Sequence, residues 1–192
     1  MQAFLVSTGV VAVSEIGDKT QLLALLLAAR FKRPLPIVGG IIVATLFNHA
    51  IAGALGAWLG GAVDQGYLRW ILGALFIGMG IWALVPDTLD ETKVEEAATT
   101  FGIFWITVVT FFLAEMGDKT QLATAALAAR FAAVVEVVAG TTLGMLIADV
   151  PAVFLGHLFS EQAKGSWVRY VAAAIFIILG ILTLIPGLVP VF

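Results

Sequence analysis

The sequence lacks cysteine and carries few charged residues, and each shortage excludes a class of protein. Without cysteine the chain forms no disulfide, no thiolate metal site and no cysteine nucleophile. Charged residues make up 12% of the 192 residues, against about 25% in soluble proteins, while hydrophobic residues make up 61%. A soluble domain of this length cannot bury so much apolar surface. The ten lysine and arginine residues are scattered and the net charge is −3, which argues against a nucleic-acid partner.

Six apolar stretches are long enough to cross a lipid bilayer as helices, which takes about 20 residues each. They do not show the alternation of polar and apolar residues that strands of a membrane barrel need. The expected spans are residues 3–29, 36–60, 67–85, 102–129, 132–158 and 167–189. The sequence therefore predicts an all-α integral membrane protein with six transmembrane helices.

The lysine and arginine residues of the expected loops are distributed unevenly. Loops after the first, third and fifth spans carry Arg30, Lys32, Arg33, Lys93, Lys164 and Arg169, whereas the other loops carry Arg69 and Arg130. Cytoplasmic loops of membrane proteins are enriched in these residues. The pattern predicts that both termini lie outside and that the acidic loop 87–100 is cytoplasmic.

One segment of the sequence occurs twice, 100 residues apart. Residues 15–22 read EIGDKTQL and residues 115–122 read EMGDKTQL, while LAARF recurs at 27–31 and 127–131. We therefore expect two three-helix repeats, 1–86 and 101–192, joined by the loop 87–100. Three is an odd number, so the second repeat must be inverted relative to the first. Secondary transporters share this plan and bind substrate near the bilayer midplane, between the repeats.

The two copies of this motif place charged residues near the centres of the first and fourth expected spans. A charge there costs about 2.5–3.5 kcal/mol on insertion scales, so it normally faces a partner or a wet cavity. The spacing i, i+3 and i+4 puts the three charges of each copy on one face of a helix. Gly17 and Gly117 would allow either close helix approach or a local break. The charged residues are Glu15, Asp18, Lys19, Glu115, Asp118 and Lys119.

Four carboxylates and two ammonium groups leave a surplus of two negative charges, which matches one divalent cation. Oxygen ligands without cysteine favour Mg²⁺, Ca²⁺ or Mn²⁺. The lysines either pair with a carboxylate when the metal is absent or only balance charge. Alternatively, the ion pairs only join the two repeats, but that role does not require surplus carboxylates. The predicted metal ligands are Glu15, Asp18, Glu115 and Asp118, with Thr20, Gln21, Thr120 and Gln121 as neutral oxygen donors nearby.

Further polar residues occur in the second and fifth expected spans. Asn48 and His49 correspond through the repeat to Ala148 and Asp149. We predict Asn48 and Asp149 as additional metal ligands. His49 is the side chain that titrates most readily near neutral pH, so it is a candidate for proton coupling or a packing residue.

The doubled Glu-x-Gly-Asp-Lys-Thr sequence resembles the Gdt family of cation/proton exchangers, which includes Golgi and chloroplast manganese/calcium transporters and bacterial manganese exporters. The resemblance covers nearly the whole chain. It implies that the motif residues form the cation site, with Mn²⁺ as the first choice of substrate and Ca²⁺ as the second. The compact form resembles a bacterial member, which implies the bacterial cytoplasmic (inner) membrane.

These observations lead to the hypothesis of a secondary transporter, not an enzyme, that exports a divalent cation in exchange for protons and needs no prosthetic group. A passive channel is the first alternative, although carboxylates and lysines would hold an ion too firmly for fast conduction. An intramembrane enzyme using Asp18 and Asp118 as acid and base is the second. That chemistry does not require the neighbouring glutamates and lysines. The sequence makes no prediction of oligomeric state.

Overall fold

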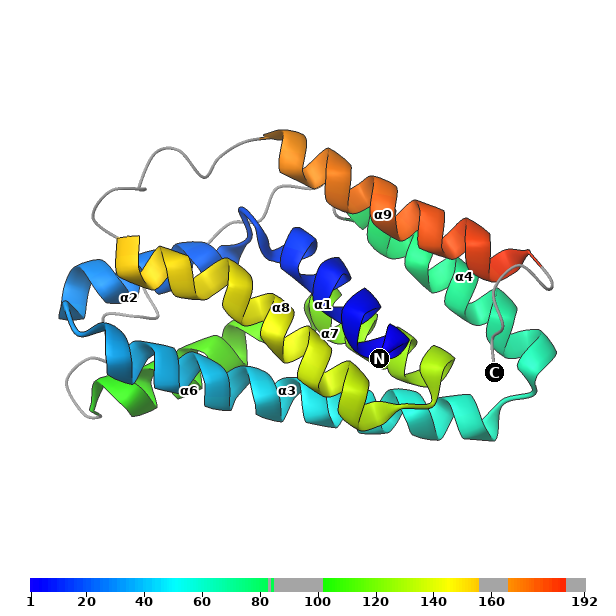
Figure 1. Cartoon of the computed structure of the whole chain (residues 1–192), viewed down its shortest axis with the longest axis horizontal. Helices are drawn as coiled ribbons and strands as arrows, with labels where there is room; N and C mark the ends of the chain where they lie inside the picture. Colours follow the sequence, from blue (N-terminus) through cyan, green and yellow to red (C-terminus); the bar gives the residue numbers. More distant parts are fainter. Residues whose placement is uncertain (83, 85–101, 156–165, 186–192) are drawn as a thin grey trace.

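The computed structural model describes residues 1–82, 84, 102–155 and 166–185, and every regular element within these ranges is an α-helix. This confirms the prediction of an all-helical protein. The predicted loop 87–100 lies outside the described residues, as do Lys93 and Lys164. The helices are α1 (Gln2–Glu15), α2 (Lys19–Phe31), α3 (Pro34–Ala62), α4 (Gln65–Trp82), α6 (Ile103–Glu115), α7 (Lys119–Phe131), α8 (Val134–Leu155) and α9 (Ser166–Leu184) (Figure 1).

Two of the helices are long and apolar enough to cross a membrane, judged by length and composition: Pro34–Ala62 and Val134–Phe154. The apolar helices Gln2–Glu15, Gly66–Trp82, Ile103–Glu115 and Ala173–Leu184 are shorter. Large apolar side chains lie exposed along α3, among them Phe47, Leu55 and Trp58, with exposed fractions of 61%, 55% and 68%. Soluble proteins rarely expose apolar surface of this extent, so this outer face suits contact with lipid.

The first expected span is interrupted, and so is the fourth. α1 ends at Glu15 and α2 begins at Lys19, because Gly17 adopts a left-handed conformation with φ of 81°. Gly117 does the same between α6 and α7, with φ of 79°. The expectation that the three charges of each copy share one face of a continuous helix is therefore wrong. Gly117 is not a site of close helix approach either, because a Cβ atom added there would meet nothing within 4 Å.

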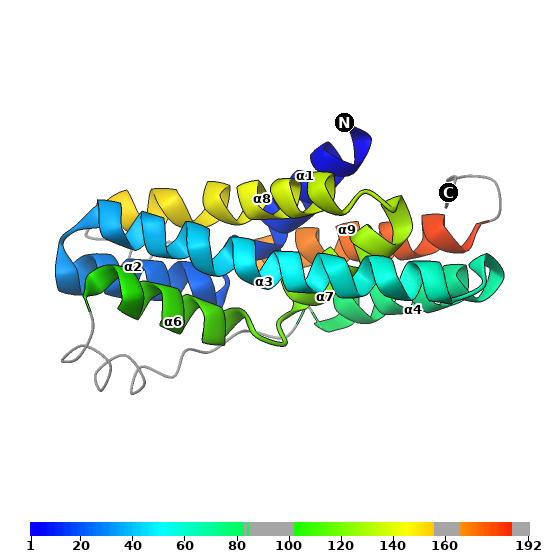
Figure 2. The same ribbon diagram turned by 90° about the horizontal axis from the view of Figure 1, so that it is seen from below.

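The long helices α3 and α8 each pack against an interrupted pair that is distant in sequence. α3 lies along α6 and α7, as Figure 2 shows, and α8 lies along α1 and α2. α4 packs against α9, with Phe76 and Phe176 buried in the core between helices. Gly17 and Gly117 themselves are exposed, but the carboxylates beside them point into the helix bundle and are buried.

The contact between α3 and α7 depends on small residues. A Cβ atom added at Gly56 of α3 would lie 2.0 Å from the backbone carbonyl oxygen of Ala125 in α7. Small residues let helix backbones approach closely, which is the usual way that helices associate in membranes. This packing fixes α7, and with it the second copy of the motif, against α3.

Candidate metal centre

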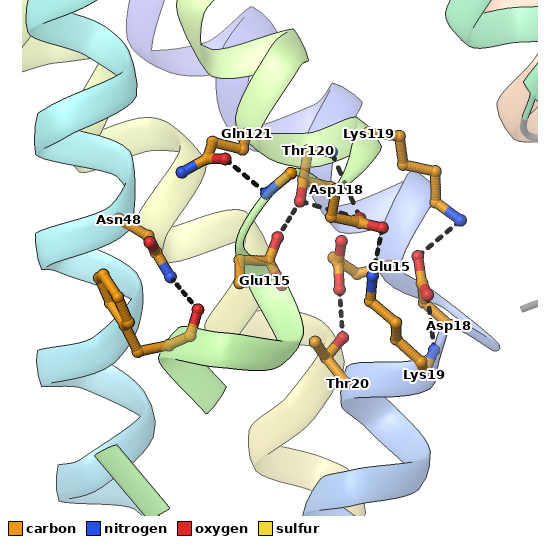
Figure 3. A network of polar contacts seen from close by, with 12 residues as sticks. Glu15, Asp18, Lys19, Thr20, Asn48, Glu115, Asp118, Lys119, Thr120 and Gln121 are labelled. Atoms are coloured by element: carbon orange, nitrogen blue, oxygen red, sulfur yellow. Dashed lines mark hydrogen bonds and ion pairs between the residues drawn. The ribbon is translucent and has the colours of Figure 1, made fainter. Parts of the chain in front are cut away.

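The two interruptions bring both copies of the motif together in the interior of the bundle (Figure 3). Glu15 and Glu115 are the last residues of α1 and α6, and Asp18 and Asp118 are the N-caps of α2 and α7. All four carboxylates are buried, with exposed fractions of 2% or less. Aspartate is a preferred N-cap, and the positive end of the helix dipole favours a negative charge there. The helix breaks thus create two places where carboxylates are stabilised inside an apolar protein.

The lysines of the motif pair across the two copies. The Nζ atom of Lys19 lies 2.6 Å from Oδ1 of Asp118, and the Nζ atom of Lys119 lies 2.6 Å from Oδ2 of Asp18. The aspartates are almost fully buried, while the lysine side chains are 20% and 7% exposed. Each ammonium group therefore neutralises a carboxylate that comes from the other copy of the motif.

The threonine of each copy orients the glutamate of the same copy. The hydroxyl of Thr20 donates to Oε2 of Glu15 at 2.5 Å, and the hydroxyl of Thr120 donates to Oε1 of Glu115. The other oxygens, Oε1 of Glu15 and Oε2 of Glu115, are buried without a hydrogen-bond partner among the described residues. Buried carboxylate oxygens normally have a partner, so these two are free to bind a cation or a proton.

Three of the carboxylates are close enough to share one ion. Glu15, Glu115 and Asp118 each offer an oxygen, and these oxygens lie within 4.8 Å of one another. Oxygen ligands lie about 2.3–2.6 Å from Ca²⁺ and about 2.0–2.1 Å from Mg²⁺, so oxygens at this spacing can contact one hard divalent cation. Asp18 is not in this set of three, and its carboxylate contacts Lys119.

The glutamines of the motif brace the turns. Oε1 of Gln21 accepts a hydrogen bond from the backbone N–H of Gly17 at 2.9 Å, and Oε1 of Gln121 accepts one from Gly117 at 2.7 Å. Nε2 of Gln21 also donates to the carbonyl of Ala148 in α8 at 3.0 Å. The side-chain oxygens of Gln21 and Gln121, which we predicted as metal ligands, therefore accept hydrogen bonds from the backbone of the left-handed turns.

Asn48, His49 and Asp149 are fully buried, at 0% exposure. The Nδ2 atom of Asn48 donates to the carbonyl of Phe112 at 3.1 Å, one turn before Glu115 (Figure 3). Asp149 lies within electrostatic range of Asp18 and Glu15. Both nitrogens of His49, both carboxylate oxygens of Asp149 and Oδ1 of Asn48 lack a hydrogen-bond partner among the described residues. α3 and α8 thus bring unsatisfied polar atoms to the bundle interior, and those of Asp149 lie near the motif.

Sequence reasoning missed two backbone groups that organise the site. The carbonyl of Phe112 accepts a hydrogen bond from the side-chain amide of Asn48, which links α6 to α3. The carbonyl of Ala148 accepts one from the side-chain amide of Gln21, which links α2 to α8. Every residue has a carbonyl, so nothing in the sequence marks these two. For the carbonyl of Ala148, the only hint in the sequence is the charged residue that follows it, Asp149.

Comparison with known proteins identifies the family. The model of the family described as "Divalent cation/proton antiporter GDT1" matches residues 3–91 and 103–190. A Vibrio cholerae protein named "Putative manganese exporter" is 44% identical over 184 residues, covering 95% of this chain and 90% of that protein. A GDT1-like protein of Synechocystis is 30% identical over 205 residues, covering 95% of this chain and 97% of the relative.

GDT1-like protein 5 of Arabidopsis thaliana is 28% identical over 225 residues, with 96% of both chains covered. No solved structure matches the chain. The family match confirms the resemblance that the doubled motif indicated, and it supports an integral membrane protein that transports cations. The chain belongs to the GDT1 family of divalent cation/proton antiporters.

Proposed function

We propose that this protein exports a divalent cation from the cytoplasm in exchange for protons, with Mn²⁺ as the preferred substrate and Ca²⁺ as the second choice. The observation that carries the proposal is the buried cluster of Glu15, Glu115 and Asp118, whose oxygens lie within 4.8 Å of one another. Carboxylates are the ligands that hard divalent cations prefer. The choice of Mn²⁺ is supported by the name of the Vibrio cholerae relative.

The proposed architecture has six membrane spans in two inverted repeats, 1–86 and 101–192, with both termini outside a bacterial cytoplasmic (inner) membrane. It is supported by local features that recur in both copies of the motif. Each copy has a left-handed glycine, an aspartate N-cap and a threonine bonded to a glutamate. The two segments that match the family model each contain one copy. The uneven distribution of lysine and arginine supports the orientation.

The proposed cation site combines the motif carboxylates Glu15, Asp18, Glu115 and Asp118 with oxygen donors around them. Thr20 and Thr120 hold the glutamates, and their hydroxyl oxygens are additional donors. Asp149 and Asn48 supply oxygens from α8 and α3, and Gln21 and Gln121 complete the set while bracing the turns. His49 is the proposed proton-coupling group outside the motif.

The proposed mechanism is exchange of charges within this cluster. A divalent cation that enters the cluster binds the carboxylates of Asp18 and Asp118 and displaces the ammonium groups of Lys19 and Lys119 from them. When the cation leaves, protons replace it on the carboxylates, because four carboxylates in a low dielectric cannot all remain charged. The surplus of two negative charges implies two protons per divalent cation. Rocking of the two repeats around the fixed site would then expose it to one side of the membrane at a time.

Reconstituted transport tests the proposal. Purified protein in proteoliposomes should take up Mn²⁺, and Ca²⁺ more weakly, and the internal pH should change in step with the uptake. Asp118→Asn should abolish both signals, whereas Asp64→Asn, at an exposed aspartate outside the cluster, should preserve them. Metal flux that changes strongly with imposed voltage at a clamped pH gradient would rule out the two-proton stoichiometry.

The two alternative functions receive less support from the geometry. A channel needs weak binding at several sites, whereas the cluster pairs buried carboxylates with ammonium groups at 2.6 Å. An acid–base pair of aspartates would require Asp18 and Asp118 to share a proton or a substrate. Here each of them contacts a lysine instead.

A further inference from the structure

A cavity of about 450 Å³ lies at one end of the bundle, where α2 ends and α3 begins, beside the last turn of α8. Figure 1 shows these three helix ends together. Its polar lining comes from Lys32 and Arg33, and its apolar lining includes Ala28, Val153 and Phe154. The volume is in the range of about 300–1,000 Å³ that is typical of small-ligand sites. The cavity therefore combines two positive charges with an apolar wall.

The two basic residues occupy a short turn whose backbone is fixed. Lys32 is the C-cap of α2, has φ of 54°, and its N–H donates to the carbonyl of Ala28 at 2.9 Å. Arg33 is the N-cap of α3, and Pro34 follows it. Glycine or asparagine is the usual residue at a left-handed C-cap, so lysine is an unfavourable choice for the turn itself. Both side chains therefore project from a defined turn of the backbone and line the cavity.

The second copy of the sequence offers an internal comparison. Residues 132 and 133, which correspond to Lys32 and Arg33, are both alanine. Ala132 also has a left-handed conformation, with φ of 49°, and it lines a cavity of about 560 Å³ at the α7–α8 turn. The charged residue in the described lining of that cavity is Asp64. The same turn therefore forms without basic residues, so the turn does not require the two cations.

The positive charge of the cavity beside Lys32 and Arg33 also makes it unsuitable as an entry path for a divalent cation. The cationic side chains of Lys32 and Arg33 in its lining would repel a divalent cation and attract an anion. An anion that also contacts an apolar wall on a membrane protein has the chemistry of a phospholipid, and basic pockets between membrane helices bind anionic lipid headgroups. Phe154, 52% exposed, and Val153 offer a surface for an acyl chain.

We propose that this cavity binds an anionic phospholipid, with its phosphate between Lys32 and Arg33 and an acyl chain along Val153 and Phe154. The site is separate from the carboxylate cluster and from the metal it would carry. A lipid bound here bridges the α2–α3 turn and the end of α8. It would thereby tie together elements that carry opposite copies of the repeated sequence.

Native mass spectrometry of the detergent-purified protein tests this site. The wild type should retain phosphatidylglycerol in preference to phosphatidylcholine. The double variant Lys32→Ala/Arg33→Ala installs the residues found at 132 and 133, and it should lose about fivefold in retention for each cation removed. Arg30→Gln is the matched control, because it removes a positive charge from the same helix end without lining the cavity.

Three outcomes would overturn the proposal. The first is equal phosphatidylglycerol retention by the wild type and the double variant. The second is equal retention of phosphatidylcholine by the wild type. The third is displacement of phosphatidylglycerol by millimolar inorganic phosphate, which would indicate a site for a free anion. The single variants Lys32→Gln and Arg33→Gln, each compared with Arg30→Gln, keep the test decisive if the double variant does not fold.

Discussion

The ammonium group of Lys19 lies 2.6 Å from the carboxylate of Asp118, a residue 99 positions away in the chain. The same contact recurs in reverse between Lys119 and Asp18. Each lysine thus forms an ion pair with an aspartate of the proposed cation site, and a metal ion would have to compete with it for that carboxylate. These crossed pairs also connect the N-terminal ends of α2 and α7, so releasing them changes both the charge and the linkage of the two motif copies.

Replacing Lys119 with glutamine should strengthen Mn²⁺ binding and slow Mn²⁺ transport. The substitution removes an internal competitor from Asp18, and a hydrogen bond to a charged group contributes about 1.5–3 kcal/mol, or roughly tenfold or more in affinity. Isothermal titration calorimetry gives the affinity, and proteoliposome flux gives the rate. Arg30→Gln, at an exposed basic residue, serves as the control. If Lys119→Gln weakens binding instead, the lysine holds the site together and does not compete with the metal.

Thr120→Val should weaken Mn²⁺ binding by about tenfold with little change in folding. Valine keeps the shape of threonine but cannot donate to Glu115, so the glutamate loses the contact that orients it. The control is Thr110→Val, because the hydroxyl of Thr110 bonds to carbonyls of its own helix. Circular dichroism melting and metal titration of both variants separate binding from stability. Equal losses of affinity in the two variants would contradict the proposed role of Thr120.

Much of the site could be predicted from the sequence, because charged residues are costly in an apolar protein and the motif occurs twice. That argument selected Glu15 and Asp118, and the structure places both in the buried cluster. The repeated motif also indicated that Gly17 has a structural role, either in close helix packing or in a break of the helix. It did not decide between close packing and a break, since either use suits a residue without a side chain.

The pairing of the charges was beyond sequence reasoning. Treating residues 3–29 as one helix placed Lys19 on the same face as Asp18, its own neighbour. The break at Gly17 separates Glu15, at the end of α1, from Asp18 and Lys19, at the start of α2. The contact of Lys19 with Asp118 depends on how α2 and α7 lie relative to each other. Only tertiary packing, including the close approach of α3 and α7 at Gly56, determines that placement.

Gly117→Ala should destabilise the protein and reduce transport through backbone strain. A Cβ atom at this position meets nothing within 4 Å, but the residue has φ of 79°, and a left-handed conformation costs a non-glycine residue about 1–2 kcal/mol. Gly102→Ala is the control, since Gly102 also has open space but φ of −61°. Thermal unfolding in detergent should show a lower midpoint for the first variant alone. Equal midpoints would mean that the turn accepts alanine without strain.

Gly56→Ala should be more damaging than Gly117→Ala, because it introduces a clash between two helix backbones. The added methyl group would lie 2.0 Å from the carbonyl oxygen of Ala125, so α3 and α7 must separate. Overpacking of this kind costs about 1–3 kcal/mol or more, and α7 carries Asp118 and Lys119 at its start. We expect a lower unfolding midpoint together with weaker Mn²⁺ binding.

The control for this last change is Gly61→Ala on the same helix, where an added Cβ atom meets nothing within 4 Å. It adds the same methyl group and has the same helix propensity, so it isolates the effect of the clash. Wild-type Mn²⁺ affinity in Gly56→Ala, with stability reduced, would mean that α3 supports the fold without positioning the cluster. Loss of affinity in Gly56→Ala with Gly61→Ala unaffected would instead place the α3–α7 contact in the support of the cation site.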